Sequence, residues 1–236
     1  MERTLHLRLT CGLLASAARL TPVPFLDDFL GDRARRLMVD KTLSAHGRRF
    51  PSKQVAPLYA DPHGCLYGCL LSAVKLLLFP VKKVLTWLFA LRYLTRDLSD
   101  AVLLGRALDG WLEAGRLADA TDPPARLQEA SLLRSAFDNA VAGTDMQLLQ
   151  GLLMKALRGV SGLPKAAWHA VRRLRRGGAG ADPTEGLSQA DDDAMKRGTA
   201  KLGAALETPE ARAFLEAFDA RLAENVRILE ARHASG

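Results

Sequence analysis

The feature that most constrains the fold is a long apolar segment, residues 64–91. These 28 residues carry only three charges, on Lys75, Lys82 and Lys83. As one helix at ~1.5 Å per residue, the segment would be roughly 42 Å long, enough to cross a bilayer core of about 30 Å. At about 100° per residue its polar and small residues share one arc, and the other faces are apolar. A chain with this segment must cover it with other helices or with lipid.

Three structures fit this pattern. A spanning helix is disfavoured, because lysines in the middle of a span cost about 2.5–3.5 kcal/mol each. A helix, or a hairpin broken at Pro80, can lie in the membrane interface with its lysines reaching the headgroups. A core helix of a globular bundle can turn its narrow polar stripe to solvent. For the membrane alternatives, the expected contact residues are Lys75, Leu76, Leu77, Leu78, Phe79, Lys82, Lys83, Leu85, Trp87 and Phe89.

The rest of the chain favours helix. Aromatic residues are 6% of the sequence, Ala, Leu and Arg dominate, and no strand-like alternation of useful length occurs. We predict an all-α fold, an irregular bundle of about seven to nine helices with the apolar segment as one long central helix or a broken hairpin. The other expected helices are an amphipathic one at 3–20, then 27–45, 97–117 capped by Asp97, Ser99 and Asp100, 123–141 after Asp122, 144–160 with a capping box from Thr144, 165–176, and two more from Ser188 and Thr208.

Charge divides the chain into unlike parts. Residues 1–176 carry a net charge of +11, whereas residues 177–236 carry −4. We therefore predict a basic helical domain at 1–176, a Gly-rich linker at 177–187 and an acidic C-terminal helical pair at 188–236. This asymmetry indicates either an anionic partner for the first part or a contact between the two parts.

The basic part ends in a run of arginines, Arg172, Arg173, Arg175 and Arg176. One interpretation is a surface for anionic lipid headgroups, which would make an anionic membrane surface the main partner. The alternatives are a solvated helix end stabilised by the helix dipole, or pairing with the acidic residues 191–193. We do not expect a nucleic-acid partner, because no Asn, Gln or Ser and no stacking aromatics stand among these arginines.

The last helix offers a second contact surface. Its apolar residues Leu215, Phe218, Leu222, Val226 and Leu229 fall on one face at helical spacing. Residues 209–230 are accordingly a candidate surface for a protein partner.

Motifs of enzyme chemistry are missing from the sequence. There is no phosphate-binding loop, nucleophile elbow, metalloprotease motif or Cys-x-x-Cys pair. Asp61, His63, Cys65 and Cys69 do not have a common zinc spacing. We therefore predict no catalytic residue, no cofactor and no metal. Three cysteines form no disulfide framework, which favours the cytoplasm or the cytoplasmic face of a membrane.

One stretch has a family-like pattern. Pro22, Pro24 and Asp27 stand at the entry of the expected second helix, Met38 lies within it, and Gly47 follows it. These residues resemble the entry motif of EcsC-like and GTPase-associated helical membrane domains. The resemblance covers residues 20–47 and implies membrane association without a known catalytic centre.

Together, these features predict a non-enzymatic, membrane-associated helical protein of bacterial type. Two alternatives stay open. The chain can be a soluble helical adaptor with 64–91 as its core, or an enzyme with an unrecognised site.

Overall fold

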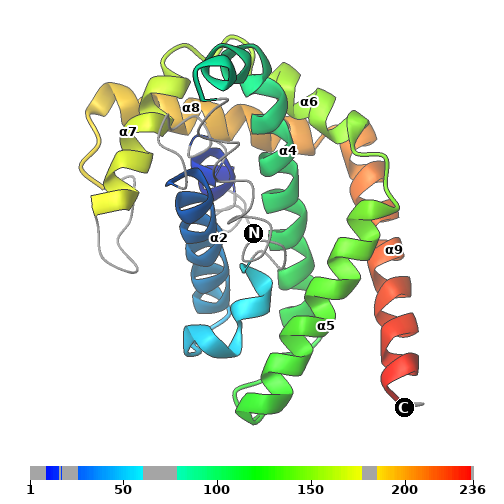
Figure 1. Cartoon of the computed structure of the whole chain (residues 1–236). Helices are drawn as coiled ribbons and strands as arrows, with labels where there is room; N and C mark the ends of the chain where they lie inside the picture. The colour runs from blue at the N-terminus through cyan, green and yellow to red at the C-terminus, as the bar shows by residue number, and fades with distance from the viewer. Residues whose placement is uncertain (1–8, 16, 18–25, 61–78, 177–184, 235–236) are drawn as a thin grey trace.

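The computed structural model describes residues 9–15, 17, 26–60, 79–176 and 185–234, with the backbone alone at 26–30, 79–94 and 174–176. Within these residues the chain forms helices and no strand, which confirms the all-α fold class (Figure 1). The elements are α2 (Leu26–Ala45), the short 3₁₀ helices η1 (Ser52–Gln54) and η2 (Ala56–Leu58), α4 (Phe79–Glu113), α5 (Pro123–Ala142), α6 (Gln147–Leu157), α7 (Leu163–Arg176), α8 (Gln189–Leu206) and α9 (Pro209–Ala234). Residues 9–15 and 17 are also helical.

The second half of α4 is at the centre of the bundle. α4 contacts α2, α5, α6 and α9, and Figure 1 shows α2 on one side of it and α5 on the other. Its buried apolar side chains are Leu98, Ala101, Val102, Leu103, Leu104, Ala107, Leu108, Trp111 and Leu112. The half of α4 around which the described core is built therefore lies downstream of the apolar segment that the sequence singles out.

α4 runs through a position where the sequence predicts a helix start. Asp97, Ser99 and Asp100 lie inside this 35-residue helix, so the prediction that they cap a new helix was wrong. The Ser99 hydroxyl donates to the Thr95 carbonyl at 2.7 Å, which lets a serine sit inside the helix without an unpaired polar group. Pro80 lies in the first turn of α4, where a proline needs no helical N–H partner.

The predicted apolar segment is only partly described. Residues 64–78 lie outside the described residues, and 79–91 form the first turns of α4. In the part of the chain that the structure describes, no helix combines the length and the apolar character needed to cross a bilayer. The single long apolar helix over 64–91 is therefore not confirmed.

The N-terminal helical stretch is buried on all sides. Every residue from 9 to 15 is buried, so the amphipathic pattern expected there was wrong for this part. Gly12 explains how closely the stretch lies against α4: a Cβ at this position would be 2.7 Å from Cδ1 of Leu98 and 3.2 Å from Cβ of Ala101. Two helix backbones approach one another here because the glycine has no side chain.

The C-terminal helices belong to the common core. α8 packs on α6 and α7, and α9 packs on α5. Met195, Leu202 and Leu206 from α8 and Phe218 from α9 join the same cluster of buried residues as α4. The charge boundary near residue 177 is thus not a boundary of the described core.

Local signals predict most helix ends. Asp122 precedes α5 in an extended conformation, and the Ser188 side chain accepts a hydrogen bond from the Asp191 N–H at the start of α8. The capping box from Thr144 was wrong, because the Thr144 hydroxyl donates backwards to the Ala140 carbonyl at 2.7 Å. Asp145 accepts a hydrogen bond from the Gln147 N–H instead, at 3.0 Å.

Gly47 terminates α2 as its sequence position predicts. Its φ is +72°, and the following N–H of Arg48 donates to the Leu43 carbonyl at 2.9 Å. This left-handed C-terminal cap is favourable for glycine and strained for residues with a Cβ.

Gly→Ala substitutions inside α2 and just after its end should therefore have opposite effects on the free energy of unfolding. Gly47→Ala should lower the free energy of unfolding by about 1 kcal/mol, because alanine is strained at positive φ. Gly31→Ala, inside α2 with no atom within 4 Å of a new Cβ, should raise it by about 0.5–1 kcal/mol through helix propensity. Urea denaturation followed by circular dichroism measures both, and a loss of stability in both variants would contradict this account of the cap.

Candidate functional site

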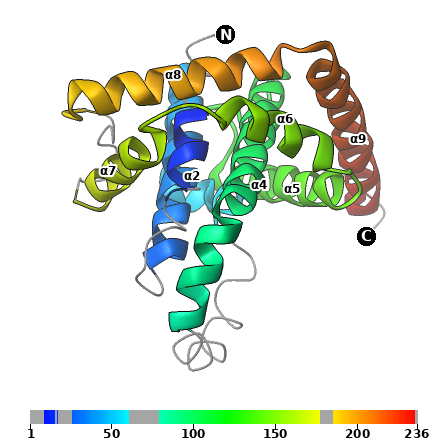
Figure 2. The same cartoon turned by 90° about the horizontal axis from the view of Figure 1, so that it is seen from above.

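Four of the ten candidate membrane-contact residues precede α4, and the other six lie in its first turns. Lys75, Leu76, Leu77 and Leu78 lie outside the described residues. Phe79, Lys82, Lys83, Leu85, Trp87 and Phe89 lie on the first turns of α4, for which the structure describes the backbone. Figure 2 shows this part of α4 projecting beyond the other helices, while its second half lies among them.

The candidate anion-contact residues lie in the second half of α7. Arg172 and Arg173 are exposed, and the side chains of Arg175 and Arg176 lie outside the description. The opposite side of α7 is buried, through Leu163, Ala166, Ala167, Ala170 and Val171. α7 is consequently a strongly amphipathic helix that lies on α8 and turns its basic face to solvent.

The junction of α7 and α8 carries a hydrogen-bonded histidine–carboxylate pair. Nδ1 of His169 lies 2.7 Å from Oδ2 of Asp191, and the Ser188 hydroxyl donates to the same oxygen at 2.8 Å. Hydrogen bonds from His169 and Ser188 lower the pKa of Asp191. Arg173 donates to the Gly186 carbonyl at 2.8 Å. The sequence alternative in which this basic helix pairs with residues 191–193 thus holds for His169, whereas Arg173 bonds to a backbone carbonyl.

This junction does not have the geometry of a hydrolase triad. The hydroxyl of Ser188 donates to the carboxylate of Asp191 and not to the imidazole of His169, so the imidazole is not placed to take its proton. Ser188 and Asp191 are accounted for as the N-terminal cap of α8.

Two ion pairs join the basic part of the chain to the acidic part. Arg106 of α4 makes a two-pronged contact with Asp219 of α9, at 2.8 Å from Nε and 2.6 Å from Nη2 to Oδ2. Arg116 pairs with Glu230 of α9 at 2.5 Å. Part of the charge asymmetry of the sequence is therefore accounted for by contacts between the basic and the acidic parts of the chain.

The family-like residues have structural positions. Met38 is fully buried in the core, Gly47 caps α2, and Asp27 lies in the first turn of α2. Pro22 and Pro24 lie outside the described residues. The described members of this motif shape α2 and its packing, and they do not converge on one surface.

The face of α9 proposed for a protein partner is mostly covered. Leu215, Phe218 and Leu222 are buried in the core, and Val226 and Leu229 are half-buried against it. In this region the large apolar side chain that remains exposed is Ile228.

A polar cluster between α2, α4 and α5 escaped the sequence analysis. Burial raises the pKa of Asp100 to about 6, and the negative charge of Asp97 adds to the rise. Positive charges of Arg96, Arg134 and Arg35 act in the opposite direction. Two acidic residues three positions apart within an apolar helical pattern are the signal that could have revealed this cluster.

Asp100→Asn should stabilise the fold above about pH 6 and have little effect near pH 4. The folded-state pKa lies above the unfolded value of 3.8, so the unfolded chain loses its proton first and stability falls as the pH rises between these values. A neutral amide removes that loss, which we expect to be worth about 2 kcal/mol at neutral pH. Urea denaturation at several pH values measures it, with Asp119→Asn at an exposed position as the control. An equal change in the free energy of unfolding at all pH values would contradict the raised pKa of Asp100.

The described residues contain no group of three or more His, Cys, Asp or Glu side chains arranged to hold a metal ion. Asp61, His63, Cys65 and Cys69 lie outside the described residues.

Comparisons of the chain with protein-family models, with curated proteins and with solved structures found no match.

Proposed function

We propose that this protein is a non-enzymatic, peripheral membrane protein that inserts the first turns of α4 into the membrane interface. The observation that carries the proposal is the projection of the first turns of α4 from the bundle (Figure 2), combined with the sequence of residues 79–91. A projecting helix start with few charges gains most by burying its apolar side chains in another apolar phase.

The sequence of this projecting part suits an interface better than a span. At about 100° per residue, Lys82, Lys83 and Thr86 share one narrow arc, while Leu85 and Trp87 lie outside it. Lysine side chains on such an arc reach the headgroups, and tryptophan prefers the boundary between headgroups and acyl chains. Helices of this kind lie in the plane of the interface with the apolar face buried by about 5–10 Å.

The second half of α4 supports the proposal by anchoring the first. From Leu98 to Leu112 its apolar side chains are buried in the core, which fixes the helix to the bundle. The resemblance of residues 20–47 to EcsC-like helical membrane domains points the same way. Because three cysteines form no disulfide framework, a cytoplasmic-face location is part of the proposal.

Vesicle flotation of the full chain tests this function. Wild-type protein should float with vesicles of phosphatidylcholine and phosphatidylglycerol and keep part of its binding in high salt, because burial of apolar side chains is not screened. Leu85→Glu should reduce the partition coefficient at least about tenfold, since it removes one apolar side chain worth roughly 2 kcal/mol.

The matched control is Leu148→Glu, the same substitution at a leucine of α6 that is 47% exposed. It should float like the wild type. If the wild type does not float, or if both variants lose binding equally, the proposed insertion of α4 is wrong. Thermal unfolding of each variant separates loss of binding from loss of fold.

A further inference from the structure

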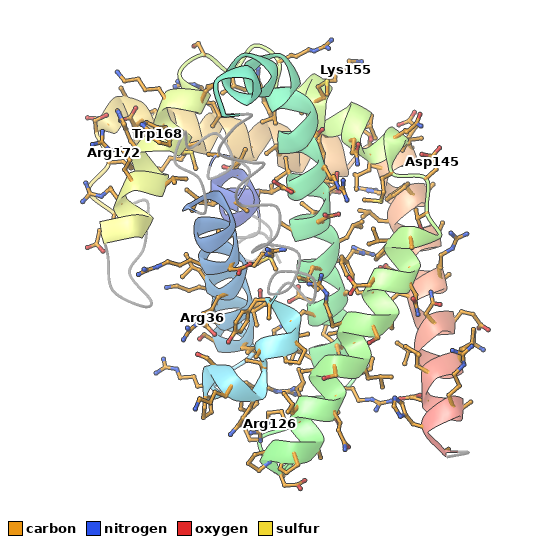
Figure 3. All side chains as sticks on the ribbon, viewed as in Figure 1. Arg36, Arg126, Asp145, Lys155, Trp168 and Arg172 are labelled. Atoms are coloured by element: carbon orange, nitrogen blue, oxygen red, sulfur yellow. The ribbon has the colours of Figure 1, made fainter. Side chains whose placement is uncertain are left out.

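The basic face of α7 has the make-up of a lipid-facing surface. Lys165 and Arg172 are seven residues apart, so they share one side of the helix, and Trp168 lies between them at helical spacing. Figure 3 shows Trp168 and Arg172 near one another on α7. Lys165 and Arg172 are exposed, and Trp168 is half-buried.

Within the described residues these cations form no salt bridge, although the charge of Lys165 adds to the lowering of the Asp191 pKa that the hydrogen bonds from His169 and Ser188 cause. Arg106, Arg116 and Arg134 pair with carboxylates on other turns or helices. By contrast, Lys165 and Arg172 form no ion pair with any described side chain, and α7 contains no acidic residue. Because α8 covers its buried side, α7 turns the exposed cations Lys165 and Arg172 to solvent.

We infer that the face formed by Lys165, Trp168 and Arg172 binds anionic phospholipid headgroups and gives the protein a preference for negatively charged membranes. This inference rests on the proposed function, because it assigns the lipid class that the membrane-bound protein selects. Cationic side chains next to a tryptophan suit a headgroup layer, where phosphate accepts from lysine and arginine while the indole lies at the apolar boundary. The arginines that follow, Arg175 and Arg176, extend the basic sequence to the end of α7.

Flotation with two kinds of vesicle tests the inference. Wild-type protein should bind vesicles that contain phosphatidylglycerol more tightly than vesicles of phosphatidylcholine alone. The double variant Lys165→Gln/Arg172→Gln should lose most of this difference, on the order of tenfold in the partition coefficient at low salt, since each basic residue near an anionic surface contributes about 1 kcal/mol. Binding to phosphatidylcholine alone should be unchanged.

The control removes the same charge elsewhere. Lys155 of α6 and Lys201 of α8 are exposed and form no ion pair with a described side chain. Lys155→Gln/Lys201→Gln should keep the preference for phosphatidylglycerol. Equal losses in the two double variants would show a general charge effect and overturn the role of α7.

The remaining outcomes separate this inference from the proposed function. Equal, tight binding of wild type to both vesicle types would overturn the headgroup preference and leave insertion of α4 intact. Failure to bind either vesicle would overturn both. If the α7 double variant kept vesicle binding and instead lost binding to a DNA duplex, α7 would be a nucleic-acid surface and the inference would be wrong.

Discussion

Phe218→Ala is expected to lower the free energy of unfolding by about 4 kcal/mol, the largest single effect we predict. Phe218 of α9 is 1% exposed, and its ring meets that of Phe137 of α5 edge to face, with centroids 5.9 Å apart. Truncation removes a buried aromatic side chain and leaves a cavity between two helices, which typically costs about 3–5 kcal/mol.

The same variant tests whether residues 185–234 fold with the rest of the chain. α8 and α9 share the core with α4. Urea unfolding, followed by intrinsic tryptophan fluorescence to which Trp111 and Trp168 contribute, should therefore remain one transition that moves to a lower urea concentration. Phe214→Ala, at a half-buried position of the same helix, should cost far less. If Phe218→Ala instead produced a separate transition at low urea and left the fluorescence transition unchanged, the C-terminal helices would form their own folding unit.

Arg126→Met should cost about 3 kcal/mol, because it removes a buried guanidinium that donates to four partly covered acceptors. Arg126 is 5% exposed near the start of α5 (Figure 3). Its guanidinium donates to the side-chain oxygen of Gln54 and to the backbone carbonyls of Ala118, Asp119 and Thr121. Hydrogen bonds to a charged donor contribute about 1.5–3 kcal/mol. Methionine fills a similar volume, so the loss reports mainly on these hydrogen bonds.

Two further variants separate the causes for Arg126. Arg126→Lys keeps the charge but not the planar fork, so it should recover part of the stability and no more. Arg212→Met removes an exposed arginine that pairs with Glu207 and should change stability by less than about 0.5 kcal/mol. Equal, small effects at Arg126 and Arg212 would contradict a structural role for the buried guanidinium.

Local sequence signals predict the ends of helices where a backbone group needs one particular residue. Gly47 at positive φ, Pro123 in the first turn of α5 and Ser188 as the cap of α8 are such positions. Each of these signals acts within four or five residues, so it can be recognised without knowing what packs nearby. The predicted bounds of α2, 27–45, differ from the observed Leu26–Ala45 by one residue for this reason.

Interactions between distant residues could not be predicted in this way. Asp97 and Asp100 have the side chains of helix caps, yet α4 continues through them, in the neighbourhood of Arg35 and Arg134 from two other helices. Arginine is usually a surface residue, yet Arg126 is buried, where Gln54 and three carbonyls from residues 118–121 accept its hydrogen bonds. Such partners are set by the tertiary structure and leave no mark at the residue itself.

In the candidate site, too, local patterns could be predicted and tertiary placement could not. Periodicity predicts that residues 79–91 are helical and amphipathic, but only the fold places the first turns of α4 beyond the bundle (Figure 2). The arginine run predicts a basic helix end, and the packing of α7 on α8 determines which of its faces is left to solvent. The pairing of His169 with Asp191 joins residues 22 positions apart, across the segment that the sequence marks as a linker.

The depth of Trp87 in a bilayer tests the central proposal most directly. Tryptophan fluorescence of the full chain is measured on vesicles of phosphatidylcholine and phosphatidylglycerol whose acyl chains carry bromine near the headgroups, which quenches only indoles in contact with it. Because Trp168 lies on the face proposed to meet the headgroups, the two proteins compared both carry Trp168→Phe. Insertion of α4 predicts strong quenching of Trp168→Phe that is largely lost in Trp87→Phe/Trp168→Phe, whereas Trp111 stays buried in the protein core. Quenching that is absent in Trp168→Phe, or equal in the two proteins, would contradict the insertion of α4.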